Sequence, residues 1–277
     1  MTSLDLPRLA GVVLVSAAAG AINSIAGGGT LLTFPALVAL GLSPIVANAT
    51  STVALVPGSL GSVWGYRREL AGARRWAIGF AVPTLLGGIA GALLLLVTRP
   101  ALFDVIVPWL VFGATLLFVV QRPVMDRIRA RAARRARSAG DVAAAPPDDA
   151  ALTRHAPRME LLAFQFFVAT YGGYFGAGAG IVMLGAFGLM GLTNIHRMNG
   201  LKNWGGACMN AIAAVIFAAS GLVNWQAALC MAGGAMVGGY SGSKLAQRIG
   251  PDAVRATIVG VGFLSTVWLL ARNAHAL

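Results

Sequence analysis

The chain has 277 residues, of which 57% are hydrophobic and only 11% are charged. Soluble domains usually carry about 25% charged residues, so the composition excludes an ordinary soluble domain and indicates a protein whose apolar surface faces lipid. The net charge of +12 is gathered in a few basic stretches rather than spread along the chain.

Five apolar segments are predicted in the first part of the chain. A spanning helix needs about 20 mostly apolar residues, and no charged residue occurs from Leu9 to Tyr66. No cleavage site follows Arg8 and its apolar run, so we interpret the first segment as a membrane helix rather than a signal peptide. The predicted segments are 7–26, 29–41, 44–66, 75–98 and 102–120.

Three consecutive glycines, Gly27 to Gly29, interrupt this apolar stretch in the sequence AGGGTLLTFP. Glycine costs a helix about 1 kcal/mol relative to alanine, and a lipid-facing segment cannot leave its main-chain groups unpaired. The segment that follows, 29–41, would reach only about 20 Å as a helix, whereas the hydrocarbon core is ~30 Å thick. We therefore expect a short helix, broken at glycines, that is either spanning or re-entrant.

A polar connector, 121–158, separates the two apolar parts of the chain. It contains six arginines in the run RIRARAARRAR, which starts at Arg127, and its tail reads PPDD at 146–149. We predict a flexible cytoplasmic loop that follows the positive-inside rule. Nucleic-acid binding is the alternative for such a run, and the membrane-like composition disfavours it.

Five more apolar segments follow the connector and match the first series at an offset of 150 residues. Gly28 matches Gly178, Gly41 matches Gly191, and the sequences GLSPI and GLTNI occupy the same place in both series. We infer an internal duplication, which is common in secondary transporters. The second-series segments are 159–176, 179–191, 196–220, 224–246 and 252–271; the predicted units are a first repeat, 1–120, the connector, 121–158, and a second repeat, 159–277.

Charge predicts that the two repeats are inverted. In the first repeat, the loop YRRELAGARRW carries four arginines, whereas the equivalent loop of the second repeat, SGLVNW, is uncharged. The next loop shows the reverse: in the second repeat it holds Lys244, Arg248 and Arg255, whereas in the first repeat it holds only Arg99, followed by Asp104. Because basic loops stay in the cytoplasm, the repeats should cross in opposite directions, with both termini outside. The predicted fold is an all-α polytopic membrane protein of two inverted-topology repeats, about five segments each, with short Gly-broken helices at the repeat interface.

Short, glycine-interrupted segments at corresponding places in two halves indicate a transport site. The second glycine cluster reads YGGYFGAGAG, ahead of segment 179–191. Main-chain N–H groups and the positive end of a helix dipole could bind an anion there. Close helix packing is the alternative explanation for the glycines.

Polar side chains follow both short segments, in the stretches ANATST and RMNGLKN. Lys202 is one of only two lysines and lies in an otherwise uncharged stretch, so we predict that it counters a bound anion; snorkelling to lipid headgroups is the alternative. Asn203 and Asn210 share roughly one helix face with it. The predicted substrate-binding residues are Asn23, Gly27, Gly28, Gly29, Thr30, Asn48, Thr50, Ser51, Gly176, Gly178, Gly180, Asn199, Lys202 and Asn203.

Two long stretches resemble one known family. NSIAGGGTLLTFPALVALGLSPIVANATS, followed by the basic YRREL, resembles the first-half signature of the TauE/SafE sulfite exporter family, and GAGAGIVMLGAFGLMGLTNIHRMNGLKN resembles its repeat. The resemblance covers nearly the whole chain apart from the connector. It implies a transporter, mostly an exporter, of sulfite or organosulfonates, and it leaves the individual substrate open.

These features predict a secondary transporter that exports a small anion, sulfite or a short organosulfonate, across the bacterial cytoplasmic (inner) membrane by alternating access. An importer of an organic carboxylate and a non-transporting scaffold that uses the Arg-rich loop stay as alternatives. An enzyme is disfavoured because the apolar segments hold no nucleophile–base pair and no metal-ligand cluster.

The expected partners are a small anionic substrate and the lipid bilayer, with no nucleic acid and no cofactor, and a homodimer stays open. No carboxylate occurs from Leu161 to Ser243, which disfavours a proton relay through acids. Sodium coupling and transport driven by the membrane potential both stay open.

Overall fold

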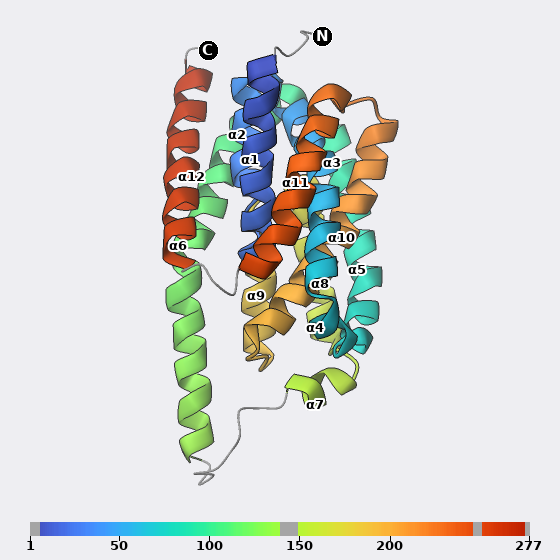
Figure 1. The fold of residues 1–277 in the computed structure, drawn as a ribbon, viewed down its shortest axis with the longest axis vertical. Helices are drawn as coiled ribbons and strands as arrows, with labels where there is room; N and C mark the ends of the chain where they lie inside the picture. The colour runs from blue at the N-terminus through green and yellow to red at the C-terminus, as the bar shows by residue number, and fades with distance from the viewer. Residues whose placement is uncertain (1–5, 139–148, 246–250, 275–277) are drawn as a thin grey trace.

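The computed structural model describes residues 6–138, 149–245 and 251–274, and the regular structure in these ranges is α-helical (Figure 1). The helices follow the predicted segments, with α4 and α7 as short additions. Their bounds are α1 (Leu6–Ile25), α2 (Thr30–Ala39), α3 (Pro44–Gly65), α4 (Arg67–Ala71), α5 (Arg74–Val97), α6 (Pro100–Ser138), α7 (Asp149–Arg154), α8 (Met159–Tyr174), α9 (Ala179–Leu189), α10 (Ile195–Ala219), α11 (Trp225–Leu245) and α12 (Pro251–Ala274).

The helices of the two halves correspond in order and in packing. α1, α2, α3, α5 and α6 begin at positions that match the starts of α8, α9, α10, α11 and α12 at the 150-residue offset to within three residues. The packing partners are exchanged in the same way: α1 packs on α11 and α8 on α5, α3 packs on α11 and α10 on α5. The remaining main contacts pair α3 with α10 and α6 with α12.

The start of α1 and the end of α12 lie at one end of the bundle in Figure 1, whereas α4, α7 and the last turns of α6 lie at the opposite end. α1 therefore runs toward the end that holds α4 and α7, whereas its counterpart α8, which follows α7 in the chain, starts at that end. Likewise α12 finishes at the end where α1 starts, while α6 finishes at the opposite end (Figure 1).

Glycines allow the exchanged helix pairs to approach closely. A Cβ added to Gly238 of α11 would lie 1.9 Å from the carbonyl oxygen of Ala17 in α1. In the equivalent pair, a Cβ on Gly91 of α5 would lie 2.0 Å from the carbonyl oxygen of Thr170 in α8. Side chains larger than hydrogen are therefore excluded at these contacts, which is the small-residue packing that membrane helices use.

Three helices in the described part of the chain are long and apolar enough to cross a membrane, namely Arg74–Val97, Pro100–Val120 and Ala256–Ala274. α3 and α10, with 22 and 25 residues, are also long enough, about 33 and 37 Å, but their polar side chains make them less hydrophobic. Large apolar side chains such as Val97 and Leu264 are exposed. Such an apolar outer surface is suited to lipid.

The connector is more ordered than its composition predicted. α6 continues without a break to Ser138, because alanine and arginine are strong helix formers and the run follows directly on a membrane-length helix. The tail then forms α7, which packs against α5. The prediction of a loop was therefore wrong for 121–138 and for 149–154, which are helical, while residues 139–148 of the connector lie outside the described residues. Arg248, which belongs to the predicted basic loop of the second repeat, also lies outside them.

Candidate functional site

The glycine break before α2 touches the start of α9. Gly27 has φ +82°, in the left-handed region that favours glycine. A Cβ on Gly27 would lie 2.8 Å from the Cα of Gly180, and one on Gly180 would lie 2.9 Å from the Cα of Gly27. Gly176 and Gly178, with φ +83° and +81°, turn the chain into α9 in the same way. The two breaks, 150 residues apart in sequence, therefore lie against each other.

Each short helix begins with N–H groups that have no acceptor among the described residues. These are the N–H groups of Gly28, Gly29 and Thr30 at the start of α2 and that of Gly180 in α9. The positive ends of both helix dipoles coincide with these groups. Unsatisfied N–H groups at the N-terminus of a helix form a site that suits an anion.

Lys202 of α10 reaches the last turn of α1. Its Nζ donates hydrogen bonds to the carbonyl oxygens of Asn23, at 2.9 Å, and Ser24, at 3.0 Å. The side-chain amide of Asn203 donates to the same Ser24 oxygen at 3.0 Å. Lys202 is only 2% exposed, so the predicted alternative, snorkelling to the headgroups, does not describe its position. An ammonium has three N–H donors, and two of them are used by these carbonyls.

A small polar cavity of about 20 Å³ lies where these elements meet. A cavity of this size holds about one water molecule. Both halves of the chain contribute to its walls, and none of the lining residues is acidic. The lining residues are Asn23, Gly27, Thr30, Leu55, Gly176, Gly180, Met183, Lys202, Asn203, Gly206, Met209 and Asn210.

Comparison with known proteins places the chain in a family. The family model described as "Sulfite exporter TauE/SafE" matches residues 12–269. The chain belongs to the TauE/SafE sulfite exporter family. This agrees with the resemblance inferred from the two glycine-rich stretches.

Curated relatives of this TauE/SafE chain are named as membrane transporters. "Probable membrane transporter protein YfcA" of Escherichia coli (strain K12) is 29% identical over 270 residues, which cover 95% of this chain and 90% of that protein. A "Probable membrane transporter protein" of Haemophilus influenzae is 25% identical, covering 95% of this chain and 94% of that protein. "Probable membrane transporter protein ORF9" of a Sinorhizobium species is 28% identical, covering 100% and 98%. No solved structure matches the chain significantly.

Half of the predicted site residues line the cavity of this TauE/SafE protein. The seven are Asn23, Gly27, Thr30, Gly176, Gly180, Lys202 and Asn203. The other glycines face elsewhere, because a Cβ on Gly28 would enter the ring of Phe118 in α6, and one on Gly178 would meet Ala114 of the same helix. Gly29 is the residue before α2 and packs against α1.

The other four predicted polar side chains are buried away from the cavity. The side-chain amide of Asn48 donates to the carbonyl oxygen of Tyr174 at 2.8 Å. Thr50 accepts the main-chain N–H of Asn224 at 3.0 Å, and Ser51 bonds with the hydroxyl of Thr33 at 2.5 Å. Asn199 is 4% exposed and its Oδ1 has no partner among the described residues. The contacts of Asn48, Thr50 and Ser51 link helices to other parts of the bundle, and none of the four side chains lines the polar cavity.

The sequence did not reveal several residues that shape the site. Asn210 lines the cavity, as its shared face with Lys202 suggested, but it was not among the predicted binding residues. Met183 and Met209 also line it, and apolar side chains within apolar helices carry no sequence signal of such a role. Nothing in the sequence indicates that α7 binds the start of α10.

Asp149 of α7 makes that contact. Its carboxylate accepts the main-chain N–H and the hydroxyl of Thr193, both at 3.0 Å, and the N–H of Asn194 at 2.8 Å. On its other side α7 meets the first half, where the hydroxyl of Thr153 donates to the carbonyl oxygen of Gly72 at 3.1 Å. α7 therefore joins the α4–α5 turn to the GLTNI turn of the second half.

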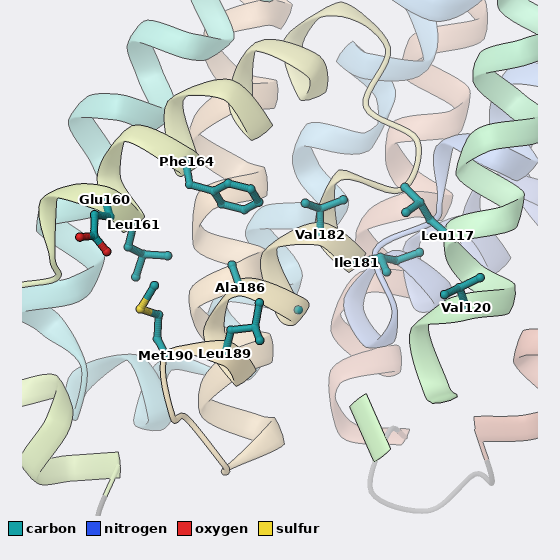
Figure 2. A pocket seen from close by; sticks show the side chains of 11 residues that line it. Leu117, Val120, Glu160, Leu161, Phe164, Ile181, Val182, Ala186, Leu189 and Met190 are labelled. Atoms are coloured by element: carbon teal, nitrogen blue, oxygen red, sulfur yellow. The ribbon is translucent and has the colours of Figure 1, made fainter. Parts of the chain in front are cut away.

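A larger pocket of about 450 Å³ lies between α6, α8 and α9 (Figure 2). Its walls are almost entirely apolar, with Glu160 at one end of the lining residues and Val120 at the other (Figure 2). An acidic residue and apolar walls do not suit an anion. The polar cavity, although much smaller, is therefore the better candidate for the substrate.

No group of three or more His, Cys, Asp or Glu side chains that could hold a metal ion occurs in the described parts of the chain. Cys208 and Cys230 are free thiols. The chemistry of the polar cavity thus consists of main-chain N–H groups, side-chain amides, a hydroxyl and one ammonium.

Proposed function

We propose that the protein is a secondary transporter that exports a small anion, sulfite or a short organosulfonate, across the bacterial cytoplasmic membrane. The family description names sulfite export, and the curated relatives are named as membrane transporters. The observation that carries the proposal is the polar cavity, which is lined by Lys202 and by Thr30 and Gly180, the two residues at the starts of the broken helices whose N–H groups have no acceptor among the described residues.

The donors around the cavity suit an oxyanion. Sulfite and sulfonates each present three oxygen acceptors on one sulfur atom. The amides of Asn23, Asn203 and Asn210, the hydroxyl of Thr30 and the ammonium of Lys202 are all able to donate. Because no acidic residue lines the cavity, bringing an anion there meets no repulsion from a fixed negative charge.

Alternating access between two inverted repeats is the proposed mechanism. The exchanged packing of helix pairs, the opposite directions of corresponding helices and the contribution of both halves to one cavity support it. In such transporters, one repeat rocks against the other around a site near the middle of the membrane. Export of an anion from a cell that is negative inside gains about 2.3 kcal/mol per unit charge per 100 mV, so the membrane potential alone can drive it.

Flux measured in proteoliposomes under an imposed potential tests the proposal. Sulfite, sulfoacetate, taurine, sulfate and acetate would be offered to the parent protein, to Lys202→Met and to Lys244→Met. Lys244, the other lysine of the chain, is exposed and lies over the ring of Tyr240, so it is a matched control. We expect saturable flux of the sulfur anions, at least tenfold lower in Lys202→Met and unchanged in Lys244→Met. Flux of acetate alone would indicate a carboxylate transporter, and no flux from folded protein would favour a scaffold.

Reporter fusions test the inverted arrangement separately from the substrate. The basic segments Arg67–Ala71 and 127–137 belong to α4 and to the end of α6, which lie opposite the two chain ends (Figure 1). By the positive-inside rule, a reporter fused after Ser138 should be cytoplasmic and one fused at the C-terminus should be external. A cytoplasmic C-terminus would contradict the inverted repeats.

A further inference from the structure

The last turn of α1 forms a group of carbonyl oxygens inside the bundle. α1 ends at Ile25, and the chain then turns at Gly27. The carbonyl oxygens of Asn23 and Ser24 lie at this negative end of the helix dipole, and each receives the Nζ of Lys202 at 2.9 and 3.0 Å. Both acceptors are main-chain oxygens, so the ammonium is held as an ion would be rather than in an ion pair.

Among the described residues, no cationic side chain bonds to the equivalent helix end in the other half. α8 ends at Tyr174, which corresponds to Ser24 at the 150-residue offset. Its carbonyl oxygen accepts the neutral side-chain amide of Asn48 at 2.8 Å. Thr52, which corresponds to Lys202, bonds only to the Asn48 carbonyl oxygen of its own helix. A side chain that can carry a positive charge therefore lies at one of two otherwise similar helix ends.

Carbonyl oxygens at the C-terminal ends of broken helices coordinate Na⁺ in transporters built from inverted repeats. Here the last turn of α1 has the same chemistry, and a side chain of the opposite half supplies the positive charge. The stem of that side chain also passes the start of α9, because a Cβ on Gly180 would lie 3.1 Å from Cδ of Lys202. The ammonium is thus tethered between α1 and the start of α9.

We propose that the Lys202 ammonium fills a monovalent-cation site at the end of α1, and that removing its side chain exposes this site to a small cation such as Na⁺ or an alkylammonium ion. The wild-type transport cycle then needs no bound Na⁺, a consequence that rests on the proposed function. The cation site itself rests only on the contacts of Lys202.

Thermal unfolding of the purified protein tests the site without requiring transport. Lys202→Ala lacks a segment equivalent to n-propylammonium, whereas Lys202→Met lacks the charge but fills most of the space. Each variant, with Lys244→Ala as control, would be melted in NaCl, methylammonium chloride, n-propylammonium chloride and choline chloride at equal ionic strength. We expect a saturating rise in the melting temperature of Lys202→Ala, about 5 °C over choline, with n-propylammonium or Na⁺ and no such rise in the other proteins.

Equal melting temperatures of Lys202→Ala in all four salts would overturn the proposal, and so would the same rise in Lys202→Met, because that would not require a vacant site. If Lys202→Ala is recovered in folded form only when n-propylammonium or Na⁺ is present during purification, the site is supported. Failure to recover it with any of the cations overturns it.

Flux then separates this inference from the proposed function. Wild-type flux should be the same within twofold in Na⁺ and in choline, and Lys202→Ala should lose at least tenfold and regain flux with n-propylammonium. Wild-type flux that requires Na⁺ would overturn the tethered cation while keeping the transporter. If no anion moves in any condition, the proposed function fails, and the melting temperatures alone decide the cation site.

Discussion

Replacing Gly180 with alanine tests whether the contact between the two glycine breaks is needed. The new methyl group would lie 2.9 Å from the Cα of Gly27 and 3.1 Å from Cδ of Lys202. The lysine stem can shift, but the backbone of Gly27 cannot do so without opening the break. Overpacking of this kind costs about 1–3 kcal/mol. The methyl group would also take up room in a cavity of only about 20 Å³.

Gly185→Ala in the same helix is the matched control, because a Cβ there meets nothing within 4 Å. Both changes gain about 1 kcal/mol of helix propensity, so the difference between the two variants isolates the contact. We expect Gly180→Ala to melt about 4–8 °C below Gly185→Ala, which corresponds to about 2 kcal/mol. Its flux in proteoliposomes should fall at least tenfold. A Gly180→Ala protein that is as stable and as active as Gly185→Ala would refute the assignment of this contact to the site.

Two further predictions concern contacts outside the cavity. Gly28→Ala puts a methyl group 2.2 Å from the ring of Phe118, so we expect its melting temperature to fall by several degrees. Adding Phe118→Leu should restore both the melting temperature and the flux in the double variant. A double variant whose flux stays low would place Gly28 at the substrate. Asp149→Asn replaces a carboxylate that accepts hydrogen bonds from three donors of the GLTNI turn, namely the N–H and hydroxyl of Thr193 and the N–H of Asn194. The substitution should therefore lower the free energy of unfolding by about 1–3 kcal/mol. Asp104→Asn, measured beside it in the same melting assay, should have little effect, and equal losses in the two variants would contradict the role of α7.

The position of the broken helices could be predicted because three independent signals agree. Glycine clusters, segments too short to span and a constant offset all pointed to the same two places, and α2 and α9 have only 10 and 11 residues there. Helical periodicity then placed Lys202 and Asn210 on one face, and both line the cavity. These features are local, so composition and spacing are enough to identify them.

The direction of individual groups could not be predicted, because it depends on how distant helices dock. A glycine cluster specifies a break, but only the packing of α6 decides that Gly28 faces Phe118 while Gly27 faces Gly180. The acceptors of Lys202 belong to α1, 178 and 179 residues earlier in the chain. The sequence predicts Asp149 only as part of a flexible tail, because nothing in it indicates that the partners of this carboxylate lie in the GLTNI turn.

The size of the cavity decides which parts of the protein must move in the proposed cycle. Sulfite, the proposed substrate, has four heavy atoms and is larger than the single water molecule that the cavity holds, so the proposed cycle requires the walls of the cavity to move apart when the anion enters. The pairs α1–α11 and α5–α8 are held at glycine contacts to main-chain oxygens, which favours each pair moving as a unit.

The short helices can adjust between these units, since left-handed glycines flank both of them: Gly27 and Gly41 at α2, and Gly178 and Gly191 at α9. At the end of the bundle that holds α4, α7 joins the two halves through Asp149 and Thr153. Opening at that end therefore requires these hydrogen bonds to break or α7 to travel with α10. For this reason the melting temperature and the flux of Asp149→Asn should be measured together. A variant that unfolds at a lower temperature but exports faster would identify α7 as a restraint on opening. A variant with both a lower melting temperature and a lower flux would identify α7 as a structural support only.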